Sequence, residues 1–153
     1  MADAPSYAGG GADIDRLSID LTAFNDDVQA AALDLERLIA LGTSPDGGVL
    51  ASARLRFSRA LRVHLQHVDG AVLPALRRAA DARMRAAIDE YRRVLHDYHE
   101  AAAHHVARWP SAAVTADWDG YRHSVADMLA RLSRRVAVEQ RIVHPLLTRT
   151  GDR

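Results

Sequence analysis

Apolar residues recur along most of the chain in alternating steps of three and four positions, with polar residues between them. The first such series consists of Ile14, Leu17, Leu21, Phe24, Val28, Ala31, Leu35 and Leu38. A repeat close to 3.6 residues places these positions on one stripe of an α-helix, and such a stripe is expected to face a core. The sequence therefore predicts a first amphipathic helix that contains residues 14–38.

Three further series have the same spacing. The second consists of Leu50, Phe57, Leu61, His64, Val68, Ala71 and Ala75. The third consists of Met84, Ile88, Tyr91, Leu95, Tyr98, Ala102, His105 and Trp109. The fourth consists of Val125, Leu129, Leu132, Val136, Glu139, Val143 and Leu146. No strand pattern competes with them, so they predict three more helices, and His64 and Glu139 are expected to face the core.

Helix-breaking residues separate these four segments. Residues 42–48 gather Gly, Ser, Pro and Asp, and Pro74 is expected to kink or stop the second helix near its end. Pro110 ends the third helix, and a loop from 110 to 116 follows, with Thr115 or Asp117 as the next N-cap. Four long helices with short connections predict an all-α, up-down-up-down four-helix bundle in one domain, residues 13–149. Residues 1–12 are Gly- and Ala-rich and are predicted to be a flexible, disordered tail.

The composition narrows the possible functions. The 153 residues include no cysteine, so any metal must be bound by His, Asp or Glu. The formal net charge is zero, which argues against a nucleic-acid partner. No apolar run approaches the roughly twenty residues that cross a bilayer, and no signal-peptide pattern is present, so a cytoplasmic protein without a membrane partner is expected. Neither a phosphate-binding Gly loop nor a nucleophile elbow occurs, so an enzyme is not expected.

Two stretches of the chain are similar to each other at the same spacing. They are residues 61–69 with 72–76, and residues 132–140 with 142–147. His64 in the first stretch corresponds to Arg135 in the second, and Val68 corresponds to Glu139. Each stretch thus keeps one half of a His-x-x-x-Glu pair. In a bundle, a His and a Glu four positions apart point the same way and can reach one ion.

These stretches resemble the hemerythrin-like, or HHE cation-binding, family. The residues that carry the resemblance are His64, His67, Asp69, Leu73-Pro74-x-Leu76, Glu139, Pro145-Leu146-Leu147, Trp109, Trp118 and Tyr121. The resemblance spans about residues 14–148. It implies a bundle with a di-iron centre, to which each half gives a His from one helix and a His-x-x-x-Glu pair from the next. Such a centre binds oxygen or related small molecules.

Carried over residue by residue, the resemblance leaves gaps in the ligand set. His64 and Glu139 match family ligands, whereas Val68 and Arg135 stand where a carboxylate and a histidine are expected. The first helix has no histidine and offers Asn25, Asp26 or Asp27 instead. The third helix offers His96 or His99. The candidate metal ligands, for iron, are therefore His64, His96, His99 and Glu139.

Other interpretations of the same residues stay open. Arg135 keeps its charge at any relevant pH and would repel a divalent ion, so it is equally able to form a buried ion pair with Glu139 or with an aspartate of the first helix. His64 can instead be a core histidine that is hydrogen-bonded to a neighbouring helix. His96, Glu100 and His104 have a metal-ligand spacing, but this face also fits a solvated helix surface.

Two functions follow as expectations. The first is a binding or regulatory module that has largely lost its di-iron site, with a protein partner or a second copy in a homo-oligomer. The second is an iron-binding sensor or carrier of oxygen or nitric oxide, mononuclear or dinuclear. A histidine phosphotransfer domain is also a four-helix bundle, but it fits poorly because the chain has no lysine and His64 lies on a core stripe.

Overall fold

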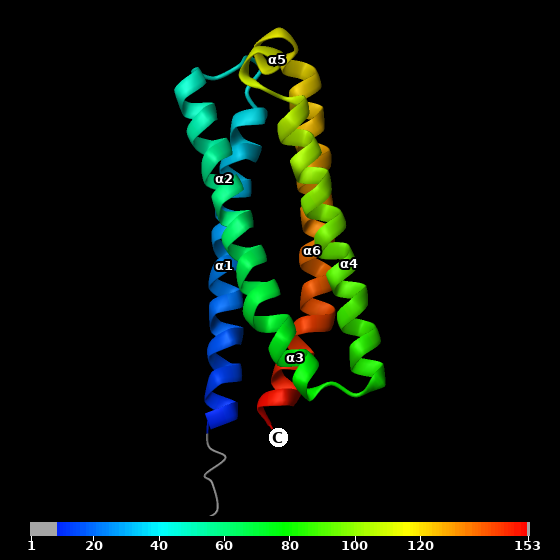
Figure 1. Cartoon of the computed structure of the whole chain (residues 1–153). Helices are drawn as coiled ribbons and strands as arrows, with labels where there is room; N and C mark the ends of the chain where they lie inside the picture. Colours follow the sequence, from blue (N-terminus) through cyan, green and yellow to red (C-terminus); the bar gives the residue numbers. More distant parts are fainter. Residues whose placement is uncertain (1–8, 153) are drawn as a thin grey trace, which may run out of the picture.

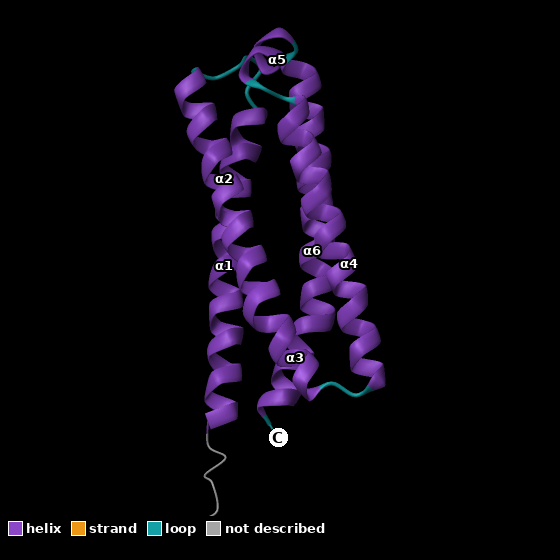
Figure 2. Cartoon of the chain, in the orientation of Figure 1, coloured by secondary structure: helices purple, strands orange, loops and turns teal. Residues whose placement is uncertain are grey.

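A computed structural model describes residues 9–152, and helices make up nearly all of this part of the chain (Figure 1). The elements are α1 (Gly9–Ile39), α2 (Gly47–His67), a π-helical turn η1 (Val68–Val72), α3 (Leu73–Ala79), α4 (Ala82–Arg108), α5 (Ser111–Ala116) and α6 (Trp118–Gly151). Figure 2 shows no strand among the described residues. The predicted all-α class is confirmed.

Four long helices, α1, α2, α4 and α6, lie side by side and alternate in direction along the chain (Figure 1). The short helix α5 and the α1–α2 connection lie at one end, while α3, the start of α1 and the end of α6 lie at the other. Helix α1 packs against α2 and α6, and α4 packs against α6. The backbones of α2 and α4 are less closely packed, and a groove opens between them.

The helix boundaries correct the sequence analysis in two places. Helix α1 begins at Gly9, so residues 9–12 are helical although they were assigned to the flexible tail, and the rest of that tail lies outside the described residues. The predicted loop after Pro110 contains α5, because Ser111, two alanines and the buried Val114 form a helical turn against the core. The following N-cap is Asp117, whose side chain accepts a hydrogen bond from the N–H of Gly120.

Pro74 changes the helix without stopping it. The helical path continues to Ala79, but η1 comes before the proline, and the N–H of Leu73 bonds the carbonyl of Val68, five residues back. Proline has no N–H and its ring crowds the preceding turn of a regular α-helix, so a wider π turn relieves this conflict. At the equivalent position in the other half, Pro145 lies inside α6.

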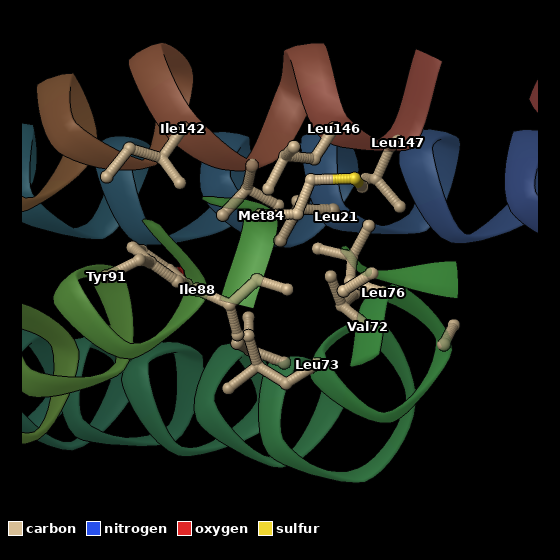
Figure 3. Packing of buried hydrophobic residues seen from close by; sticks show 14 of the residues in the cluster. Leu21, Val72, Leu73, Leu76, Met84, Ile88, Tyr91, Ile142, Leu146 and Leu147 are labelled. Atoms are coloured by element: carbon tan, nitrogen blue, oxygen red, sulfur yellow. The ribbon is translucent and has the colours of Figure 1, made fainter. Parts of the chain in front are cut away.

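Two apolar clusters fill the space between the long helices. The first lies toward α3 and includes Leu21, Leu76, Ile88 and Leu146 (Figure 3). The second lies toward α5 and includes Val28, Phe57, Trp109, Tyr121 and Leu132. On α1, α2 and α6, the positions between the two clusters are held by buried polar residues. These residues form the candidate site.

Candidate functional site

Each of the four long helices contributes to one buried polar cluster, which we call the polar layer. It consists of Asn25 on α1, His64 on α2, Tyr91 on α4, and Arg135 and Glu139 on α6. Solvent reaches at most 6% of the surface of any of these residues. All five lie on the stripe of their helix that faces the core, so ordinary amphipathic packing brings them together.

Glu139 is the centre of the polar layer. Its Oε2 accepts hydrogen bonds from Nε2 of His64 at 2.9 Å, from Nη1 of Arg135 at 3.3 Å and from the hydroxyl of Tyr91. Its Oε1 accepts a hydrogen bond from the amide nitrogen of Asn25. Both carboxylate oxygens therefore have donors, which a buried charge requires.

Arg135 fills the rest of the layer. Its Nη1 lies 3.3 Å from Oε2 of Glu139, which confirms one of the predicted alternatives, a buried ion pair between these residues. Its Nη2 donates to Oδ1 of Asn25 at 3.3 Å, so the residue that α1 supplies is the asparagine, whereas Asp26 and Asp27 are exposed. The guanidinium carbon also lies 5.8 Å from the centre of the Tyr98 ring, a cation–π distance.

The electrostatics of the layer favour one charge state. Burial alone would raise the pKa of Glu139, but the hydrogen bond from His64 and the charge of Arg135 outweigh it and lower that pKa to about 2. Burial lowers the pKa of His64, and Arg135 adds to this effect. At neutral pH the layer thus contains a carboxylate, a guanidinium and a neutral imidazole. With Nε2 of His64 protonated toward Glu139, its Nδ1 is an acceptor 3.3 Å from Nη1 of Arg135.

Of the four predicted metal ligands, only His64 and Glu139 meet. His96 is exposed and its Nε2 lies 3.3 Å from Asp69 at the surface. His99 is half-buried, and its Nε2 has no hydrogen-bond partner in the described part of the chain; burial together with the charge of Arg135 lowers its pKa to about 4. Within residues 9–152, no three His, Asp or Glu side chains are grouped so that they could hold a metal ion.

The residues present do not fit an iron centre. Two protein ligands remain, and each is already hydrogen-bonded inside the layer. A common mononuclear non-haem iron site has three protein ligands, two histidines and one carboxylate. A third position of the motif is taken by the guanidinium of Arg135, whose fixed positive charge opposes that of a metal cation.

The remaining histidines are surface or packing residues. His104 and Glu100 are 3.9 Å apart and both are largely exposed, as expected of a solvated helix face. His105 is hydrogen-bonded to the hydroxyl of Ser124 at 2.8 Å. His123 bonds the carbonyl of Asp119 within its own helix.

Tyr91 is the residue of the polar layer that sequence reasoning missed. It was assigned to the apolar stripe of its helix, but its hydroxyl donates to Glu139. A usable signal existed, because a buried tyrosine hydroxyl needs a polar partner and Glu139 needed one as well. Tyr98 follows Tyr91 by seven residues, about two helical turns. Its hydroxyl is buried and has no hydrogen-bond partner among the described residues.

A second feature lies beside the polar layer. The groove between α2 and α4 has a volume of about 360 Å³ and is lined mainly by apolar side chains. His99 lines this groove, and the charge of Arg135 in the polar layer contributes to its lowered pKa.

Within the described residues, no helix is long and apolar enough to span a bilayer. Comparison with protein-family models, with curated proteins and with solved structures finds no match to this chain.

Proposed function

We propose that the chain is a hemerythrin-like, up-down-up-down four-helix bundle in which an ion pair stands where a metal centre would be, and that it acts as a metal-free binding or regulatory module. The resemblance of the two sequence stretches supports the family. The observation that supports the functional part of the proposal is the position of Arg135, whose guanidinium lies 3.3 Å from Glu139 inside the buried polar layer.

The burial of the polar layer supports a binding function better than a catalytic one. A catalytic carboxylate or imidazole needs room for a substrate within hydrogen-bond reach. Here Glu139 and His64 have no exposed surface, and their polar atoms are used by their neighbours. The layer therefore fixes how the four helices pack, and recognition is left to the outer faces and grooves of the bundle.

Iron loading tests this proposal. Purified chain is incubated anaerobically with ferrous iron, desalted and analysed for metal. We expect well below one iron per chain, because the two remaining ligands cannot compete with the ion pair. A stoichiometry of one or two irons per chain, lost in Glu139→Gln, would contradict the proposal and support an iron-dependent sensor or carrier.

The variant Arg135→His is the matched positive control. It removes the fixed positive charge and recreates the His-x-x-x-Glu spacing with Glu139 on α6, beside His64. We expect more iron to be retained by this variant than by the unmodified chain, because three ligands then face one point. Equal iron in both proteins would show that Arg135 is not what excludes the metal.

A further inference from the structure

The groove between α2 and α4 has the size and lining of a small-molecule site. Its volume of about 360 Å³ lies in the range of natural ligand pockets, about 300–1,000 Å³. Apolar side chains form most of its wall, among them Leu55, Phe57, Leu61, Ala102, Val106 and Met128. Leu55 and Val106 are half-exposed at its rim, with 50% and 53% of their surface open to solvent. Covering them would remove apolar surface from water.

The two arginines that line this groove are its charged side chains at neutral pH, and both are positive. Arg54 and Arg62 line it together with His99 and His105, and no Asp or Glu is among the lining residues. Arg54 is already engaged, since it donates to the carbonyl of Trp109. Arg62 has no ion pair or side-chain hydrogen bond within residues 9–152. The groove therefore complements an anion, and the group available to receive it is Arg62.

The polar groups of the groove are arranged along its length. The contact of Arg54 with Trp109 marks the end nearer α5. Arg62 lies eight residues further along α2, about 12 Å away at 1.5 Å per residue. Helix α4 runs antiparallel to α2, and His99 precedes Trp109 by ten residues. His99 therefore lies at the same end of the groove as Arg62. The Nε2 of His99 is buried and has no hydrogen-bond partner among residues 9–152.

We infer that this groove binds a small amphipathic carboxylate, with the carboxylate at Arg62 and His99 and the apolar body along Leu61, Ala102 and Val106. This inference rests on the proposed function as a binding module and names its ligand class. An inorganic anion would leave the apolar wall uncovered, and an organic cation would meet two arginines. A neutral apolar molecule would leave the nitrogen of His99 without a partner.

Titration of the whole chain with octanoate tests the site, with octan-1-ol as the matched ligand that lacks the charge. Binding is followed by calorimetry and by the fluorescence of the two tryptophans, Trp109 and Trp118, which both pack against the groove residue Tyr121. We expect saturable binding of one octanoate per chain with a Kd below about 1 mM, and binding of octan-1-ol that is about tenfold weaker or more. Equal affinities, or no saturable binding of octanoate, would overturn the inference.

Substitutions at three exposed positions distinguish the contribution of the charge to binding from that of the apolar wall. Arg62→Glu should weaken octanoate binding about tenfold or more and leave octan-1-ol unchanged. Arg59→Glu makes the same change in charge on α2, but Arg59 lines a different groove, between α1 and α2, and should leave both ligands unaffected. Ala103→Leu narrows the groove itself and should weaken both ligands. Unchanged octanoate affinity in Arg62→Glu would overturn the inference.

The two proposals fail in different ways. Iron bound at Glu139 would contradict the metal-free module but would leave octanoate binding at Arg62 unchanged. Absence of octanoate binding would remove the ligand assigned to the groove while the iron content stayed low.

Discussion

The polar layer and the apolar cluster toward α3 lie in the same bundle, but their side chains have different packing requirements. In the apolar cluster (Figure 3), side chains such as Leu21, Leu76 and Ile88 need only to be covered. In the polar layer, Glu139 and Arg135 each need specific partners from other helices. The apolar cluster therefore contributes stability in many small increments, whereas the polar layer is sensitive to the loss of a single partner.

The physical reason is the cost of an unpaired charge. Truncating a buried aliphatic side chain removes its transfer free energy and leaves a cavity, about 2–5 kcal/mol in total. A buried ion pair adds little net stability, because desolvation offsets the attraction between its members. Removing one member is different, since the other charge then stays in the interior without compensation.

Glu139→Ala is expected to produce the largest effect. It leaves the guanidinium of Arg135 buried without a counter-charge and removes the acceptor of His64 and Tyr91. We expect the free energy of unfolding to fall by about 4 kcal/mol, and by no less than about 3 kcal/mol. Urea denaturation followed by circular dichroism measures it. A loss below about 1 kcal/mol would mean that water compensates Arg135 in solution.

The double variant Arg135→Met with Glu139→Leu is the control for this prediction. It removes both charges and replaces them with apolar side chains. Because no charge is stranded, we expect the double variant to be more stable than Glu139→Ala alone. A double variant that is less stable than the single one would show that the pair itself contributes a large net stabilisation.

Leu76→Ala tests the apolar cluster in the same way. Leu76 has no exposed surface and lies in the segment after η1, where α3 packs against α4 and α6. We expect a loss of about 3 kcal/mol, with the unfolding transition remaining cooperative. The same urea experiment measures it. A loss as small as about 0.5 kcal/mol would indicate that this end of the bundle is not tightly packed in solution.

Much of the fold was predictable because the helix period is a local property of the sequence. The four apolar stripes correspond to α1, α2, α4 and α6. Helix α5 and the π turn at Val68–Val72 were not predicted, because both depend on packing. A single turn such as Ser111–Ala116 has too little pattern of its own. The response of a helix to Pro74 depends on the contacts that hold the next turn in place.

The site was predictable only where two residues share a helix. Arg135 and Glu139 are four positions apart on α6, so their pairing follows from helix geometry. Whether Asn25, Asp26 or Asp27 would join them depends on the rotation of α1, which the stripe alone does not fix closely enough. His96 and His99 were proposed together, yet one pairs with Asp69 at the surface and the other lines the groove.

Acidification should destabilise the fold through its buried and half-buried histidines, His64 and His99. Burial lowers the pKa of His64 and lowers that of His99 to about 4, so the unfolded chain takes up protons below about pH 6.5 while the folded chain does not. Stability is therefore full above pH 6.5 and falls as the pH is lowered. We expect a loss of about 2 kcal/mol between pH 7 and pH 4.5, measured by urea denaturation at each pH.

Two further measurements test the cause of this pH dependence. In His99→Gln the loss should be smaller by about 1 kcal/mol, a share reduced by solvent screening because His99 is only partly buried. Below pH 4.5 the loss should continue, because the pKa of Glu139 is lowered to about 2 and its contribution disappears as the unfolded carboxylate is protonated. A free energy of unfolding that stays constant from pH 7 to pH 4.5 would contradict neutral, buried histidines.

The smallest expected change in the free energy of unfolding is that of Tyr98→Phe. Tyr98 and Tyr91 both lie on α4, but their hydroxyls have different surroundings. Tyr98→Phe removes a buried hydroxyl that has no partner among the described residues and keeps the ring beside Arg135. We expect it to raise the free energy of unfolding by up to about 1 kcal/mol. Tyr91→Phe is the matched control and should lower it by about 2 kcal/mol, because its hydroxyl donates to the Glu139 carboxylate. Since both substitutions delete one oxygen, a difference in sign would isolate the effect of the partner. The same loss in both variants would mean that the hydroxyl of Tyr98 finds a hydrogen-bond partner in solution, and the polar layer would then include Tyr98.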